Sequence, residues 1–135
     1  MKILGQNHIV KVEYDEKNSL FKHTWNDQTE AMTNEEYKKL VLWVNNLAYQ
    51  VDASFHLVNT SEFNFSISPD VQEWVASHVF PMIAEKDVKK IAFIISKDLF
   101  SQISIEQFVE ENKQAAVKVL YFDNEELALK WLFED

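Results

Sequence analysis

The sequence predicts an α/β fold in which a β-hairpin is followed by βα units. Three observations support this: polar and apolar residues alternate near the start, helix-capping sequences recur along the chain, and short apolar runs lie between them. Because strand–helix–strand crossovers are right-handed and place helices on the faces of a sheet, we expect a mostly parallel five-stranded sheet with helices on both faces. The length suits one domain, which we expect to span 1–135.

The first predicted element is a hairpin whose turn lies at 15–18. Apolar and charged residues alternate on both sides of this polar segment, as in strands with one buried face. A two- or four-residue loop would place Val12 opposite Phe21 and Lys11 opposite Lys22. We expect the apolar groups to share one face and the lysine face to be solvated.

Two helices are predicted in the middle of the chain. Thr33 and Glu36 have the spacing of a capping box, so a helix should begin there. A strand is expected over 54–60. Ser68, followed by a proline, should begin the second helix, and Pro81 should kink or end it before Met82.

The last third of the chain predicts two more βα units. The apolar run within 89–96 suits a strand buried on both faces, so we expect it to be central in the sheet. Ser104 and Gln107 have capping-box spacing, and a short helix should open there. A strand is expected over 116–122, and Asp123 with the following asparagine should cap the final helix.

Composition excludes several classes of function. The formal net charge is −9 and all 13 basic residues are lysine, so binding of nucleic acid or of an anionic membrane surface is not expected. Gly5 is the only glycine, which rules out glycine-rich phosphate loops, and we expect no cofactor. No apolar run reaches signal-peptide length and there is no cysteine, so a cytoplasmic location is expected.

Four segments together resemble the STAS-type fold of anti-sigma-factor antagonists, in particular its divergent bacterial relatives of unassigned activity. The resemblance rests on the patterns at 32–37, 63–74, 90–93 and 122–132. It implies a non-enzymatic interaction or regulatory domain. Signalling members of that family carry a phosphorylatable serine in an Asp-Ser loop after a central strand. Here the matching region, 64–70, has neither an Asp-Ser pair nor a glycine.

The predicted ends of the parallel strands supply the first candidate site. Ligands of such sheets bind beyond the carboxyl ends of the strands, where polar side chains gather. These residues could hydrogen-bond a ligand or a partner, or they could simply cap helices and end strands. Two serines nearby could accept a phosphate at a helix start. The ligand- or partner-binding candidates are Asn59, Thr60, Ser61, Phe63, Phe65, Ser66, Ser68, Ser96, Lys97, Asp98 and Asp123.

The histidines give a second set of candidates. His8 and His23 share the apolar face of the predicted hairpin with Trp25, but two imidazoles lack the third ligand that a metal site needs, so no metal is expected. If helices leave this face uncovered, it could form a homodimer contact together with Trp43, weakened by histidine protonation. His78 lies on an apolar helical stripe and is expected to be a hydrogen-bonded core residue.

We expect a protein without enzymatic activity and without catalytic residues, because its paired carboxylates are neighbours in helix ends and do not converge across a cleft. The first hypothesis is a domain that binds another protein, or itself, through its sheet edge or the surface at 61–69. The alternative is a carrier or sensor of a small apolar ligand, suggested by an aromatic supply larger than the core needs: Trp43, Phe63, Phe65, Trp74 and Phe80. Without a pocket of about 300 Å3 or more, the carrier hypothesis would lose its support.

Overall fold

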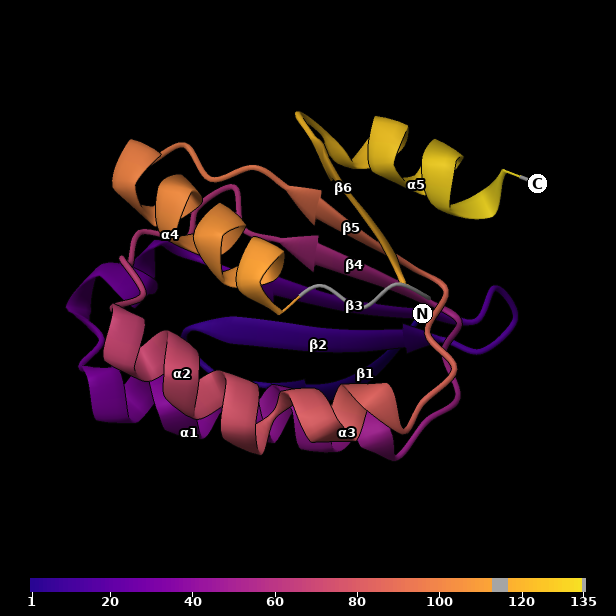
Figure 1. Ribbon diagram of the computed structural model, residues 1–135. Helices are drawn as coiled ribbons and strands as arrows, with labels where there is room; N and C mark the ends of the chain where they lie inside the picture. Colours follow the sequence, from indigo (N-terminus) through magenta and orange to yellow (C-terminus); the bar gives the residue numbers. More distant parts are fainter. Residues whose placement is uncertain (113–116, 135) are drawn as a thin grey trace.

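The computed structural model describes residues 1–112 and 117–134 and confirms the α/β class (Figure 1). Its sheet has six strands in the order β1-β2-β3-β4-β5-β6. The first three strands pair antiparallel, and β3 to β6 pair parallel. The strands are β1 (Lys2–Gln6), β2 (Val10–Asp15), β3 (Leu20–Trp25), β4 (Phe55–Asn59), β5 (Lys90–Ile94) and β6 (Lys118–Phe122).

The sheet has one strand more than predicted, because β1 pairs with β2 at the edge. β1 is short and mostly exposed, so it lacks the alternation that marks a half-buried strand. The last predicted strand began at residue 116, which lies outside the described residues; β6 begins at Lys118. β5 lies between β4 and β6, so the predicted interior position of the 89–96 run is confirmed.

The predicted register of the hairpin is wrong by two residues. Val12 pairs with His23, and Lys11 pairs with Thr24, because Asp15 and Leu20 are the last pair before a four-residue loop. Ser19 in that loop adopts a φ of 55°, and its backbone N–H donates to the Glu16 carbonyl. A shift of two residues preserves which side chains share a face, so the predicted apolar face is correct.

Five α-helices and one short 3-10 helix accompany the sheet within the described residues. Thr33 and Glu36 form the predicted capping box, and Ser68 caps the second helix as predicted. The break predicted near Pro81 occurs at Val79. The helices are η1 (Asp27–Ala31), α1 (Asn34–Tyr49), α2 (Pro69–His78), α3 (Phe80–Ala84), α4 (Leu99–Glu111) and α5 (Glu125–Phe133).

One predicted helix start is wrong, and at the final helix only one of the two predicted capping residues is the cap. Asp98 begins α4, with its carboxylate accepting from the Ser101 N–H, so Ser104 lies inside the helix. There the Ser104 hydroxyl donates to the Ser101 carbonyl and accepts from the Ile67 N–H, a tertiary contact that the local sequence does not encode. Asn124, and not Asp123, caps α5 by accepting from the Leu127 N–H.

Helices cover both faces of the sheet, unequally. Side chains of α1, α2 and α4 pack into one large core with those of β2 and β3, and Ile83 of α3 packs against it. A smaller core joins α5 to the opposite face of β4 and β5 around Leu57, Ala92 and Leu132. Figure 1 shows α1, α2 and α3 grouped together and α5 beyond β6. The four-helix side therefore has more volume to fill.

Candidate functional site

The predicted site at the carboxyl ends of the strands is largely engaged in internal hydrogen bonds. The Thr60 hydroxyl donates to the Ile94 carbonyl at 2.5 Å, and the Ser96 hydroxyl donates to the Phe63 carbonyl at 2.7 Å. The Asp98 carboxylate accepts from both the backbone and the hydroxyl of Ser101, which lowers its pKa. These groups hold the strand ends and α4 in place.

The remaining candidates at this edge make local contacts or face solvent. Asn59 accepts from the Ser61 N–H through its side chain, which closes a local turn, and the Lys97 N–H donates to the Ser61 carbonyl. Ser66, Lys97 and Asp123 are exposed. The hydrogen bonds seen here are therefore those of caps and turns.

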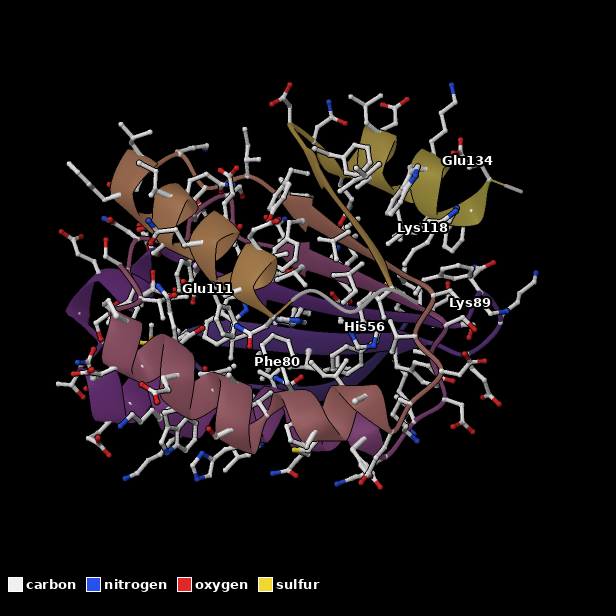
Figure 2. All side chains as sticks on the ribbon, viewed as in Figure 1. His56, Phe80, Lys89, Glu111, Lys118 and Glu134 are labelled. Atoms are coloured by element: carbon white, nitrogen blue, oxygen red, sulfur yellow. The ribbon has the colours of Figure 1, made fainter. Side chains whose placement is uncertain are left out.

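A cavity lies instead between the sheet and the four-helix side. Its volume is about 140 Å3, and its lining comes from β3, β4, β5 and β6 on the sheet and from α1 to α4 opposite. Figure 2 shows His56 and Phe80 in this space between the two layers. Six aromatic side chains are part of the lining: Trp25, Tyr37, Phe63, Phe80, Phe93 and Phe108.

The register explains why these side chains meet. Phe21 is opposite His56, His56 is opposite Ile91, and Ile91 is opposite Val119 across neighbouring strands. Because side chains alternate between faces along a strand, residues two positions further on point to the same side. His23 therefore also points into the four-helix side.

Two neutral histidines are the most unusual part of the lining. Burial lowers the pKa of His23 to about 3, with a further contribution from His56, and burial lowers the pKa of His56 to about 4. Their rings flank Phe21, with centroid separations of 5.8 and 5.1 Å. No lysine, aspartate or glutamate is among the described residues that line the cavity.

The two histidines differ in their hydrogen bonding. The Trp25 indole Nε1–H donates to Nδ1 of His23 at 2.8 Å. His56 is 93% buried, since only 7% of its surface is accessible. Among residues 1–112 and 117–134, neither ring nitrogen of His56 has a hydrogen-bond partner, and neither does Nε2 of His23.

Other polar groups also border the cavity. The side-chain amides of Asn45 and Asn112 donate to the carbonyls of Val41 and Phe108, one turn back in their helices. The Tyr37 hydroxyl is buried, and burial raises its pKa, so it remains protonated at neutral pH.

Sequence reasoning missed His56 altogether. The pattern that could have identified it is local. His56 stands between Phe55 and Leu57 in a segment without charged residues, and such a segment predicts a strand buried on both faces. His78, predicted to be in the core, is exposed; its Nδ1 is 2.9 Å from the Trp74 carbonyl and its ring stacks on the Trp74 indole. The histidine with an apolar setting is therefore on the sheet and not on α2.

The predicted dimer contact required the apolar face of the hairpin to be left uncovered by helices, and this condition is not met. Trp25 is 3% exposed and packs against Tyr37 and Phe63, because the helices cover this face of the hairpin. His23 lines the cavity, and Trp43 packs on Gly5. Of the four candidates, only His8 is exposed. Self-association through another surface stays a prediction.

Comparisons with models of protein families, with curated proteins and with solved structures find no match for this chain. The resemblance to STAS-type domains therefore stays a prediction. In the part of the chain that the structure describes, no group of three or more His, Cys, Asp or Glu side chains is placed to hold a metal ion. No helix among the described residues has the length and apolar character needed to span a bilayer.

Proposed function

We propose that this protein is a carrier or sensor of a small, mainly apolar molecule held in the cavity between the sheet and α1 to α4. The observation that supports the proposal is the cavity itself, about 140 Å3 in volume and bordered mostly by aromatic and aliphatic side chains. Concave, mainly apolar spaces with a few polar groups are typical of ligand sites.

The volume restricts the ligand. It is below the roughly 300 Å3 expected of a carrier pocket, which removes the support for a carrier of drug-sized molecules and confines the proposal to smaller ligands. An engineered apolar cavity of about 150 Å3 in another protein stays dry and binds benzene. A single aromatic ring or a short branched chain is the size that fits.

Energetics also support a role for the cavity. Apolar side chains around an unfilled space lack contacts that packed side chains make. A ligand that fills the space restores the lost contacts, so binding and stability are coupled.

The test is calorimetric titration with toluene as probe. We expect a Kd between about 0.1 and 1 mM, as the size of the probe allows. Val58→Phe places extra atoms in the cavity and should weaken toluene binding at least tenfold, because Val58 is part of the lining. The control is Ala92→Val, which adds atoms to the core under α5 and should leave binding unchanged. Absence of toluene binding to the unmodified protein would overturn the proposal.

A second candidate is the protein-interaction domain that the sequence predicted. One observation favours it: Leu99 and Phe100, at the start of α4, are 67% and 71% exposed. They follow the Lys97–Ser61 backbone hydrogen bond, so they lie beside the predicted interaction surface at 61–69. Native mass spectrometry of protein from cell extract distinguishes the candidates, since it shows a retained small molecule or a retained second chain. Phe100→Ser should release a bound chain, and Ile3→Ser, at another exposed apolar position, should not.

A further inference from the structure

We infer that the ligand of the cavity carries one hydroxyl group, which accepts a hydrogen bond from His23 and donates one to His56. This inference rests on the proposed ligand-binding function and names the chemical class of the ligand: a neutral small alcohol or phenol with an apolar body.

The hydrogen bond from Trp25 determines which ring nitrogen of His23 carries the proton. An indole N–H can only donate a hydrogen bond, so the Trp25 bond requires Nδ1 of His23 to be the acceptor. A neutral imidazole with an accepting Nδ1 carries its hydrogen on Nε2. Trp25 therefore sets the tautomer, and His23 offers a donor on the side of its ring away from Trp25.

Both ring nitrogens of His56 are available to a ligand. A neutral imidazole has one donor and one acceptor nitrogen, and both are without a partner among the described residues. Neither nitrogen is among the enclosed side-chain atoms that lack a partner, so both keep some accessible surface. His56 lines the cavity, so a bound molecule is placed to supply the missing partner.

The other polar groups of the lining are less available to a ligand than the two histidines. The Thr60 hydroxyl and the two asparagine amides already donate to backbone carbonyls. Tyr37 packs among Trp25, Phe63 and Phe65 and comes from α1, on the opposite wall of the cavity. The histidines lie on neighbouring strands of one wall, on either side of Phe21, and both line the cavity.

The absence of charged side chains from the described lining favours a neutral ligand. A carboxylate or an ammonium group in this apolar space would need a partner of opposite charge, and the described lining has none. Both imidazoles are neutral at physiological pH. A hydroxyl fits this setting, because it both accepts and donates without carrying charge.

The experiment compares phenol with toluene, two rings of nearly equal size that differ in a hydroxyl and a methyl group. Without a partner in the cavity, toluene should bind better, because phenol loses its hydrogen bonds to water. With the histidines as partners, we expect phenol to bind the unmodified protein at least tenfold more tightly than toluene. In His56→Leu we expect the preference to reverse, with toluene affinity kept within threefold.

Tyr37→Phe is the matched control, since it removes the other unpaired polar group of the lining and should leave the preference for phenol intact. Imidazole 15N resonances of the unmodified protein give an independent readout: phenol should shift the signals of both His23 and His56, even if His56→Leu fails to fold.

The outcomes separate this inference from the proposed function. Equal binding of the two probes overturns the inference. A preference for phenol that is lost in Tyr37→Phe but kept in His56→Leu also overturns it, and assigns the hydroxyl contact to Tyr37. Unshifted imidazole resonances on phenol binding overturn it as well. If neither probe binds, both the inference and the proposed function fail.

Discussion

At the scale of single residues, Gly5 is required because of a close approach. A Cβ atom at this position would lie 2.6 Å from Cζ2 and 2.9 Å from Cη2 of Trp43, and 3.1 Å from Cδ1 of Leu47. The first two carbons belong to the Trp43 indole ring, which lies against Gly5 in β1. The single glycine of the chain therefore allows α1 to pack against the edge strand.

Gly5→Ala should destabilise the protein by about 1–3 kcal/mol, as overpacking of a filled space does. The matched background is Trp43→Phe, since phenylalanine lacks both of the indole carbons that the new methyl group would meet. The cost of Gly5→Ala should fall by more than half in that background. Urea unfolding of the four proteins measures this, and an equal cost in both backgrounds would show that the indole is not the reason for the glycine.

At the scale of elements, β5 connects the two cores. Its side chains alternate between the cavity side, with Ile91 and Phe93, and the α5 side, with Ala92 and Ile94. Lys90 adds to the second contact, since its ammonium group donates to the Trp131 carbonyl and lies 5.0 Å from the centre of the Trp131 ring. The strand is therefore held from both sides and by both neighbouring strands.

Ile94→Ala should lower the free energy of unfolding by about 2–5 kcal/mol through lost burial and the cavity that is left. Ile94 is 3% exposed, whereas Ile3 on the edge strand is 52% exposed. Ile3→Ala is therefore the control, with an expected loss below about 0.5 kcal/mol. A loss below 1 kcal/mol for Ile94→Ala in urea unfolding would mean that the α5 core adds little to stability.

At the scale of the whole molecule, the two histidines that line the cavity link stability to pH. The unfolded chain binds protons at histidine near pH 6.5, whereas the folded chain resists protonation until the pH approaches the lowered pKa values, about 4 for His56 and about 3 for His23. Between these limits the unfolded state holds more protons, so stability rises with pH. Their contribution is complete above pH 6.5 and is lost progressively as the pH falls toward 4.

We expect each of these histidines to contribute a slope of up to about 1.4 kcal/mol per pH unit between pH 6 and pH 4.5. Carboxylates also titrate in this range, so the informative quantity is the difference between variants. His56→Leu should remove one histidine's share of the slope, and His8→Asn, at an exposed position, should leave the slope unchanged. Urea unfolding at several pH values measures it; identical slopes for His56→Leu and the unmodified protein would show that His56 is not protected from protonation.

Local patterns explain where the sequence analysis succeeded. Thr33 and Ser68 cap helices as predicted, because a cap involves residues only a few positions apart. Ser104 does not cap a helix, although its spacing matches a capping box equally well. Asp98 begins α4 earlier, and the Ser104 hydroxyl accepts a hydrogen bond from the distant Ile67 N–H. Where two local sequences could each begin the helix, a contact between distant segments accompanies the choice.

Alternation and capping patterns along the chain are enough to predict the fold class. They also predict which side chains of the hairpin share a face, since a period of two survives the two-residue error in register. That the four-helix side holds a cavity, and that His23 and His56 face it, follows from the tertiary structure alone. The physical reason is that the space between layers depends on how side chains from eight separate elements fill it together. Neither that shared volume nor the position of the two histidines around Phe21 is encoded in any short stretch of chain.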